Sequence, residues 1–439
     1  MAGLSRRRKI TRRALLGTGL AIGLTTQPSA PRADACPLTD VSTPLSSPTG
    51  RPVSEFSLLA AAQARCEEVI ATTGELVRCE SPSRDLAAVK RSATLVARLG
   101  EKILGSAGEV IEAEGVAHVR WRFGTEPVRV LVLAHHDTVW PVGTLERIPW
   151  STNGGQLRGP GCVDMKAGLA QGLYALAMLR DSGVALSGLS LLVTGDEETG
   201  SATSRELIRT EAGNCDAVFV LESAGTDGAL KTGRKGPSRY KLEVHGKAAH
   251  AGLEPEKGAN ASVELAHQIL AAVALTSLET GTTVTPTLVQ AGASQNTVPD
   301  RATCSLDARA WTVEEQRKLN DTIHAFTTTV PGCSITVTGG PSRPPMEPAT
   351  SAALFSLAQT IAQQEGLPEV TQESVGGASD GNITAGMGIP TLDGIGAVGG
   401  DAHADNEHVT IESIPARTAL LAGLLAATLQ PTQPLTTQR

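Results

Sequence analysis

Short apolar runs alternate with longer, helix-like stretches along most of the chain. The short runs are nearly continuous in apolar residues, which is typical of strands buried on both faces. A regular alternation of strand and helix predicts an α/β sheet with helices packed on both of its sides. We expect helices at residues 56–79, 86–104 and 165–179 and strands at residues 128–133, 189–193 and 217–221.

The pattern changes near Pro237. The elements that follow are a strand, a helix, two strands, a helix and a strand, at residues 240–244, 261–275, 283–289, 302–308, 314–326 and 334–337. That order predicts a ferredoxin-like βαββαβ domain. Helical and strand segments resume over residues 349–429, so the smaller domain is expected to be inserted into the larger one.

Length and the terminal segments complete this organisation. The chain has 439 residues, more than the ~250–300 at which one hydrophobic core stops growing, so two folded domains are expected. The predicted segments are a signal peptide (1–35), a linker rich in Pro, Ser and Thr (36–54), the first part of the larger domain (55–236), the inserted domain (237–345), the second part of the larger domain (346–430) and a tail (431–439).

Composition and charge exclude some classes of partner. Hydrophobic residues make up 41% and charged residues 19% of the chain, as in soluble globular proteins, and aromatic residues only 3%. The net charge is -7; residues 1–35 hold seven basic residues and one acid, which is +6, so the remainder carries -13. An acidic body repels phosphate backbones, so nucleic acid is not expected as a partner.

The N-terminal segment has the pattern of an export signal. A basic region precedes an apolar run at residues 14–24, which is too short for the ~20 residues of a membrane span, and the small-residue pattern Ala33-Asp34-Ala35 follows. Thr11-Arg12-Arg13-Ala14-Leu15-Leu16 resembles the twin-arginine motif. Export without a membrane span is therefore expected; a disordered basic tail is the alternative. Cys36 invites a lipoprotein interpretation, but Ala33 stands where a leucine is usual.

The seven cysteines include no CxxC pair, so neither a zinc ribbon nor a disulfide framework is indicated. A bridge between Cys304 and Cys333 of the inserted domain is a possibility that the sequence leaves open.

Carboxylates and histidines gather where strands are expected to end, the edge at which α/β sheets bind ligands. Taken singly, these could be a surface turn, a helix N-cap or a solvated acidic loop. Together, two histidines and three carboxylates suit zinc, and a bridging carboxylate could support two metal ions. Glu197 remains as a general base. The proposed ligands are His135, Asp164, Glu198, Glu222 and His403.

These motifs, in this order, resemble the di-zinc metallopeptidase family of bacterial glutamate carboxypeptidase, aminoacylase and succinyl-diaminopimelate desuccinylase, over residues 55–430. The resemblance implies a zinc-peptidase-like catalytic domain with a central mixed sheet flanked by helices. It implies that His135 and Glu222 hold one zinc ion, that Glu198 and His403 hold the other, and that Asp164 bridges both. Glu197 would be the general base, and Asp137 would orient His135. The peptide bond from Asp164 to Met165 would be cis. Glutamate at position 222 resembles the carboxypeptidases and deacylases of the family.

The inserted domain resembles the family's lid and dimerisation domain. In this resemblance His250, within Val244-His245-Gly246-Lys247-Ala248-Ala249-His250-Ala251-Gly252, stabilises the oxyanion, in the same subunit or across a homodimer. Asn296 and Arg309 match the positions that bind the substrate's free carboxylate. The sequence departs from glutamate-releasing relatives at Ala229, where they have lysine; Lys231, Arg234 or Lys235 could substitute.

The function expected is that of an exported dinuclear zinc carboxypeptidase, which hydrolyses the amide bond before a C-terminal amino acid in a small peptide or N-acyl amino acid. An N-acyl amino acid deacylase of the same family is the alternative within the enzymes. A non-catalytic zinc-dependent binding protein is the alternative from another class; Glu197 argues against it, because a binding protein does not need a base beside its ligands.

Overall fold

The computed structural model describes residues 57–430. The predicted signal peptide, the whole of the predicted linker with Cys36, and the tail expected at residues 431–439 lie outside the described residues. Between residues 57 and 430, no helix combines the length and the apolar character needed to cross a membrane.

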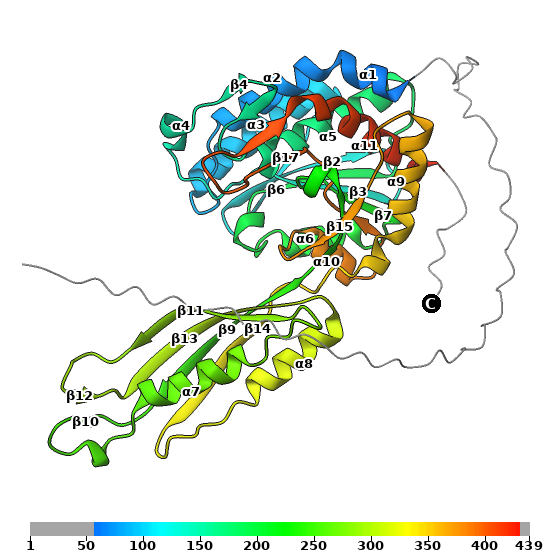
Figure 1. Ribbon diagram of the computed structural model, residues 1–439. Coiled ribbons are helices and arrows are strands. Elements are labelled where there is room, and N and C mark those ends of the chain that lie inside the picture. The colour runs from blue at the N-terminus through cyan, green and yellow to red at the C-terminus, as the bar shows by residue number, and fades with distance from the viewer. Residues whose placement is uncertain (1–56, 431–439) are drawn as a thin grey trace, which may run out of the picture. The chain divides into compact units, whose positions relative to one another are not determined.

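The larger domain is built on a six-stranded mixed sheet (Figure 1). Strands β3, β6, β7 and β16 run parallel to one another, and β2 runs antiparallel to both β6 and β1. In sheet order the strands are β1 (Glu109–Ala113), β2 (Val116–Phe123), β6 (Leu189–Thr194), β3 (Val130–His135), β7 (Ala217–Val220) and β16 (Thr391–Leu392). The expected central mixed sheet is confirmed.

Helices cover both faces of this sheet. Along β3, Val130 and Val132 enter one hydrophobic core, whereas Leu131 and Leu133 enter another on the opposite face. This alternation is why the strand is apolar at every position. The first core is formed with α1 (Leu58–Ala64), α2 (Cys66–Arg78), α3 (Leu86–Leu104), α5 (Ala167–Asp181), α9 (Ala352–Gln364) and α11 (Ile414–Leu429), and the second with α6 (Arg205–Ala212) and α10 (Gly381–Gly386).

The single helix predicted at residues 56–79 is two helices. Arg65 leaves the helical conformation, with φ -107° and ψ 4°, and ends α1 just before α2 begins. Helix α1 packs mainly on α11, whereas α2 packs on α5. Tertiary packing therefore introduces a break that the local sequence does not signal.

Shorter elements complete the larger domain. Strands β8 (Leu230–Arg234) and β15 (Gln372–Val375) form a parallel pair. Four short strands form a second sheet, in the order β17 (Gly399–Gly400), β18 (His408–Thr410), β5 (Gln156–Arg158) and β4 (Ser151–Asn153). The one-turn helix α4 (Thr144–Arg147) precedes β4.

The inserted unit has a sheet and a core of its own. Its four antiparallel strands lie in the order β11 (Thr283–Ala291), β13 (Arg301–Ala310), β9 (Gly236–His245) and β14 (Ser334–Pro341), with helices α7 (Ala261–Val273) and α8 (Val313–His324). Tyr240, Leu242, Leu265, Leu306 and Ile323 belong to this core. The chain order of strands and helices is the βαββαβ order expected from the sequence, while the residue boundaries 237 and 345 stay predictions. Cys304 and Cys333 are both free thiols.

Candidate metal centre

Three of the five proposed ligands come at or just after strands of the large sheet, as expected from the sequence. His135 is the last residue of β3, Glu222 comes soon after β7, and Glu198 lies in the short helical turn Glu197–Thr199 that follows β6. Because β3, β6 and β7 are parallel, their carboxyl ends lie at the same edge. Asp164 lies in the π-helical turn Cys162–Lys166 before α5, and His403 lies in the loop between β17 and β18.

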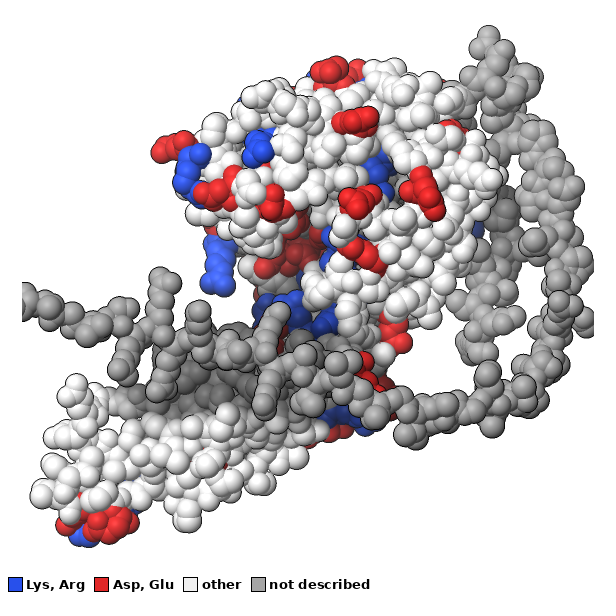
Figure 2. Space-filling model, viewed as in Figure 1, with Lys and Arg blue, Asp and Glu red and all other residues white. Residues whose placement is uncertain are grey.

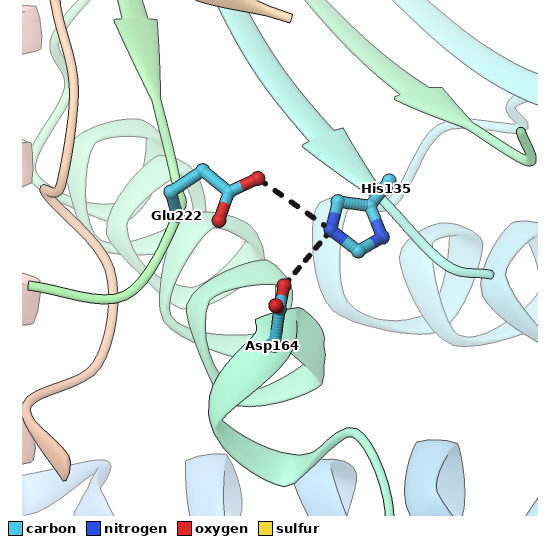
Figure 3. A group of neighbouring side chains, drawn as sticks. All are labelled: His135, Asp164 and Glu222. Atoms are coloured by element: carbon cyan, nitrogen blue, oxygen red, sulfur yellow. Dashed lines mark hydrogen bonds and ion pairs between the residues drawn. The ribbon is translucent and has the colours of Figure 1, made fainter. Parts of the chain in front are cut away.

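Three of these side chains meet in a first group (Figure 3). Nε2 of His135 lies 3.1 Å from Oδ1 of Asp164 and 3.6 Å from Oε1 of Glu222. One nitrogen and two carboxylate oxygens thus face a common point, within 4.8 Å of one another.

A second group shares Asp164 with the first. Nε2 of His403 lies 3.2 Å from Oδ2 of Asp164 and 3.4 Å from Oε1 of Glu198. The two oxygens of Asp164 therefore face different groups, Oδ1 toward His135 and Oδ2 toward His403. The peptide bond between Asp164 and Met165 is cis, as the family resemblance implies.

Asp137 supports more of this site than the sequence indicates. Its Oδ1 lies 3.5 Å from Nδ1 of His135, the contact expected of a residue that orients the imidazole. The same carboxylate also accepts hydrogen bonds from the backbone N–H of Glu197 at 3.2 Å and of Glu198 at 3.3 Å. Ser83, which no motif identified, donates to Oδ2 at 2.6 Å. The buried carboxylate of Asp137 therefore contacts both His135 and the backbone of the turn that carries Glu197 and Glu198.

The site has a strongly anionic field. Hydrogen bonds to Asp164 and Glu198 raise the pKa of His403 to about 10. Burial lowers the pKa of His135, but the hydrogen bonds to Asp137, Asp164 and Glu222 outweigh it, so its pKa lies well above the usual value. Burial raises the pKa of Glu198 to about 7. For both histidines the raised pKa is caused by the carboxylates around the ring.

The residues present fit divalent metal ions. Oε1 of Glu198 is buried, and within residues 57–430 it has a 3.4 Å contact with Nε2 of His403 but no hydrogen bond of good geometry. A bound cation would compensate the burial of this oxygen. Two imidazoles and three carboxylates without a thiolate are a donor set typical of zinc and of harder divalent ions.

Glu197 lies beside the ligands but faces a different partner. Its Oε1 lies 2.8 Å from Nη1 of Arg343, and both side chains are buried. Arg343 also contacts Asp380 at 3.1 Å and donates to Oγ of Ser201 at 2.5 Å. Burial raises the pKa of Glu197 well above its usual value, although Arg343 opposes this shift. Arg343 was missed in the sequence because a lone arginine among prolines matches no motif.

His250 and Asn296 are neighbours on the inserted unit, outside both ligand groups. The short strand β10 (Ala249–His250) pairs with β12 (Thr297–Val298), and the N–H of Ala251 donates to the carbonyl of Asn296 at 2.9 Å. Nδ1 of His250 accepts hydrogen bonds from the N–H groups of Gly252 and Leu253, both at 3.1 Å. Its Nε2 is therefore the protonated nitrogen of the neutral ring.

Arg309 has partners on two segments. Its Nε donates to Asp307 at 2.8 Å, and its Nη1 donates to the carbonyl of Gly376 at 2.8 Å. The Gly376 segment, which follows β15, was not recognised from the sequence.

The three residues that could replace the lysine absent at Ala229 differ in their surroundings. Lys231 is partly buried, and its Nζ donates to Oγ of Ser223, next to Glu222, at 3.3 Å. Arg234 forms a buried ion pair with Asp393 at 2.6 Å. Lys235 lies over the ring of Trp311, 5.1 Å from its centroid. Of the three residues, Lys231 is thus the one that contacts the sequence neighbour of the proposed ligand Glu222.

The chain resembles known proteins over much of its length. The model of the peptidase family M20/M25/M40 matches residues 131–427. Carboxypeptidase G2 from Pseudomonas sp. (strain RS-16) is 32% identical over 327 residues, which cover 73% of this chain and 78% of the relative. A succinyl-diaminopimelate desuccinylase from Thioalkalivibrio sulfidiphilus is 26% identical over 344 residues, 73% of this chain and 89% of the relative.

A solved structure shows the same fold. Aminopeptidase PepT from Bacillus cereus superposes with a TM-score of 0.68 at 22% identity, over 83% of this chain and 99% of that one. The resemblance drawn from the sequence motifs is confirmed. The chain is a hydrolase that belongs to the peptidase family M20/M25/M40.

Proposed function

We propose that the chain is an exported dinuclear zinc carboxypeptidase that hydrolyses the amide bond before a C-terminal amino acid. The observation that carries this proposal is the division of Asp164 between two ligand groups, with Oδ1 3.1 Å from His135 and Oδ2 3.2 Å from His403. A carboxylate in that position can serve two metal ions at once. The similarity to carboxypeptidase G2 supports the type of bond that is cleaved.

The ligands divide between the two proposed sites. His135 and Glu222 would hold one zinc ion and Glu198 and His403 the other, with Asp164 common to both. When bound, zinc supplies Lewis-acid polarisation of the scissile carbonyl and makes water acidic enough to ionise near neutral pH.

Glu197 would act as the general base. A carboxylate beside the ligands can take a proton from the attacking water and deliver it to the leaving amine. Burial raises the pKa of Glu197, which makes this carboxylate a better proton acceptor. Its ion pair with Arg343 has to loosen before it can receive that proton.

The inserted unit would supply substrate contacts. His250 has its Nδ1 occupied by backbone N–H groups, so its Nε2–H is free to donate to the oxyanion that develops at the carbonyl. Asn296 and Arg309 would bind the free carboxylate of the substrate, for which a guanidinium offers two parallel donors. Closure of this unit over the substrate would exclude water from the reaction.

The inserted unit would also form a homodimer. Helix α7 exposes Val263, Leu270 and Val273, with 46%, 69% and 44% of their surface accessible. The neighbouring β11 is an edge strand of its sheet and exposes Leu288. Figure 2 shows that the visible surface over α7 carries few charged side chains. An apolar helix face beside a free strand edge favours association with a second copy.

A substrate panel tests the activity. Zinc-loaded protein would be incubated with dipeptides and N-acyl amino acids that differ in the C-terminal residue, each beside its C-terminal amide, and the released amino acid would be measured by chromatography. We expect cleavage of free-carboxylate substrates, loss of activity with a chelator and recovery with zinc. A protein that holds two zinc ions yet hydrolyses no member would instead be a zinc-dependent binding protein.

The alternative activity, deacylation of N-acyl amino acids, is favoured by the similarity to succinyl-diaminopimelate desuccinylase. The same ligands and base would serve both reactions, because both break an amide bond next to a carboxylate-bearing residue. Turnover of N-acyl amino acids but not of dipeptides in the panel would select the deacylase.

A further inference from the structure

Glu407 is a fully buried carboxylate with four hydrogen-bond donors, and neither ligand group includes it. Its Oε1 accepts from the backbone N–H of Val163 at 2.9 Å and of Asp164 at 3.3 Å. Its Oε2 accepts from Nε1 of Trp140 at 2.8 Å and from the N–H of Gly161 at 3.0 Å. Three of the four donors are backbone groups of the short segment that ends at Asp164.

The donors explain why a charged residue is tolerated at this position. A buried carboxylate close to other acids is costly unless hydrogen bonds compensate its lost hydration. Each oxygen of Glu407 receives two N–H groups, so the carboxylate form uses both oxygens fully. A glutamine would direct its own NH₂ group at one of these pairs of donors and would leave them without an acceptor.

The other end of Glu407 belongs to the loop that carries His403. Within this loop the N–H of Ala404 donates to the carbonyl of Asp401, and the N–H of Glu407 donates to the carbonyl of Ala404, both at 2.9 Å. Asp401 and His403 have positive φ angles of 58° and 65°. Non-glycine residues adopt such angles only where the surrounding structure holds them there.

Glu407 therefore joins two segments that lie far apart in the sequence. One provides Asp164, whose oxygens face both ligand groups, and the other provides His403, which belongs only to the second group.

We propose that Glu407 is a positioning residue, which fixes the Asp164 turn to the His403 loop and thereby sets the ligand geometry of the two metal sites. This rests on the proposed metal-binding function. Residues that orient metal ligands change metal affinity when they are replaced, whereas a residue that only supports the fold changes stability alone.

Glu264 offers a matched control. It is also fully buried, and its Oε2 accepts from the backbone N–H of Thr329 at 2.9 Å and of Val330 at 2.6 Å. It lies on α7 of the inserted unit, away from every proposed ligand in the sequence. E264Q thus makes the same chemical change at another buried carboxylate that accepts hydrogen bonds from backbone N–H groups.

The experiment compares E407Q with E264Q and the wild type. Metal-free proteins would be titrated with zinc against a competing chelator, and their cobalt forms would be compared by visible absorption, which reports ligand geometry. We expect E407Q to lower zinc affinity about 10- to 100-fold. The loss should be larger for the ion held by the second ligand group, which includes His403, than for the ion held by the first group. The cobalt spectrum should also change. E264Q should keep both properties at wild-type values even if it unfolds at a lower temperature.

Wild-type zinc affinity and an unchanged cobalt spectrum in E407Q would overturn the positioning role. If E407Q does not fold, W140F is tested in its place, because it removes one donor to Oε2 of Glu407 and keeps an aromatic ring. A fall in the zinc affinity of W140F would support the positioning role, and an unchanged affinity would overturn it. Failure of the proposed function gives a different result, since D164N would then bind zinc as well as the wild type does.

Discussion

Nη1 of Arg343 lies 2.8 Å from Oε1 of Glu197. Arg343 follows β14, the last strand of the inserted unit, and its carbonyl accepts a hydrogen bond from Nε2 of Gln316 on α8 at 2.9 Å. The proposed base is thus paired with the segment that leads from the inserted unit back to the larger domain. A movement of that segment would change the charge environment of Glu197.

The roles of the two adjacent glutamates can be separated by replacement with glutamine. E197Q should keep both zinc ions and lose at least about 100-fold in kcat, because a general base is removed. E198Q should lose zinc, since Oε1 of Glu198 faces His403 at 3.4 Å. Metal content by mass spectrometry, together with kcat, distinguishes the two. Equal loss of metal in both variants would contradict this assignment.

Arg343 should be important for stability as well. R343A leaves Glu197 and Asp380 buried without their shared cation, which typically costs about 3 to 5 kcal/mol. The free energy of unfolding, measured by urea denaturation of metal-free protein, checks this. R317A is the control, because its ion pair with Asp321 is exposed and should contribute less than about 1 kcal/mol. If R343A lowers the free energy of unfolding no more than R317A does, the buried ion pairs of Arg343 do not stabilise the fold.

Arg309 should act on substrate binding. R309A is expected to raise KM about 10-fold or more for substrates with a free carboxylate, because the charged donors are lost, while zinc content stays unchanged. The C-terminal amide of the same substrate should be affected much less. R301A, on the same strand and exposed, should behave like the wild type. A variant R309A that still distinguishes acid from amide as the wild type does would rule out this role.

His250 should act on turnover. H250A is expected to lower kcat about 100- to 1000-fold with a smaller change in KM, because an oxyanion contact forms in the transition state. Steady-state kinetics of H250A and of the control H324A, another exposed histidine of the inserted unit, provide the comparison. A change confined to KM would assign His250 to substrate binding instead.

The proposed homodimer depends on the apolar face of α7. L270E places a charge at a side chain that is 69% exposed, so it should leave the fold intact and separate the subunits. Analytical ultracentrifugation would measure the mass of L270E and of V142E, a control at an exposed position of the larger domain. Two dimeric variants, or a monomeric wild type, would exclude this interface.

The convergence of three of the proposed ligands could be predicted from the sequence because each of them directly follows a recognisable apolar run. His135, Glu198 and Glu222 come at or just after β3, β6 and β7, and parallel strands bring their ends together. The supporting residues have no such signal. Ser83 and Glu407 contact the site through tertiary folding alone, and their sequence neighbours give no indication of a partner.

The same limit applies to the fold. The long helices and the chain order of the inserted unit follow from local patterns, whereas the break at Arg65 depends on which helix packs against α1 and which against α2. The charge partner of Glu197 is hidden for the same reason, since Arg343 lies far from it in the chain.

The ligands of the two groups enter the growing polypeptide at different times during synthesis. The first group is complete once Glu222 has been made, but the second waits for His403, after the whole inserted unit. A chain interrupted between residues 223 and 402 would keep His135, Asp164 and Glu222 and would lack both His403 and its brace Glu407. Under the proposed assignment of ligands, such a fragment could take up one metal ion at most, and full metal loading would follow completion of the second part of the larger domain.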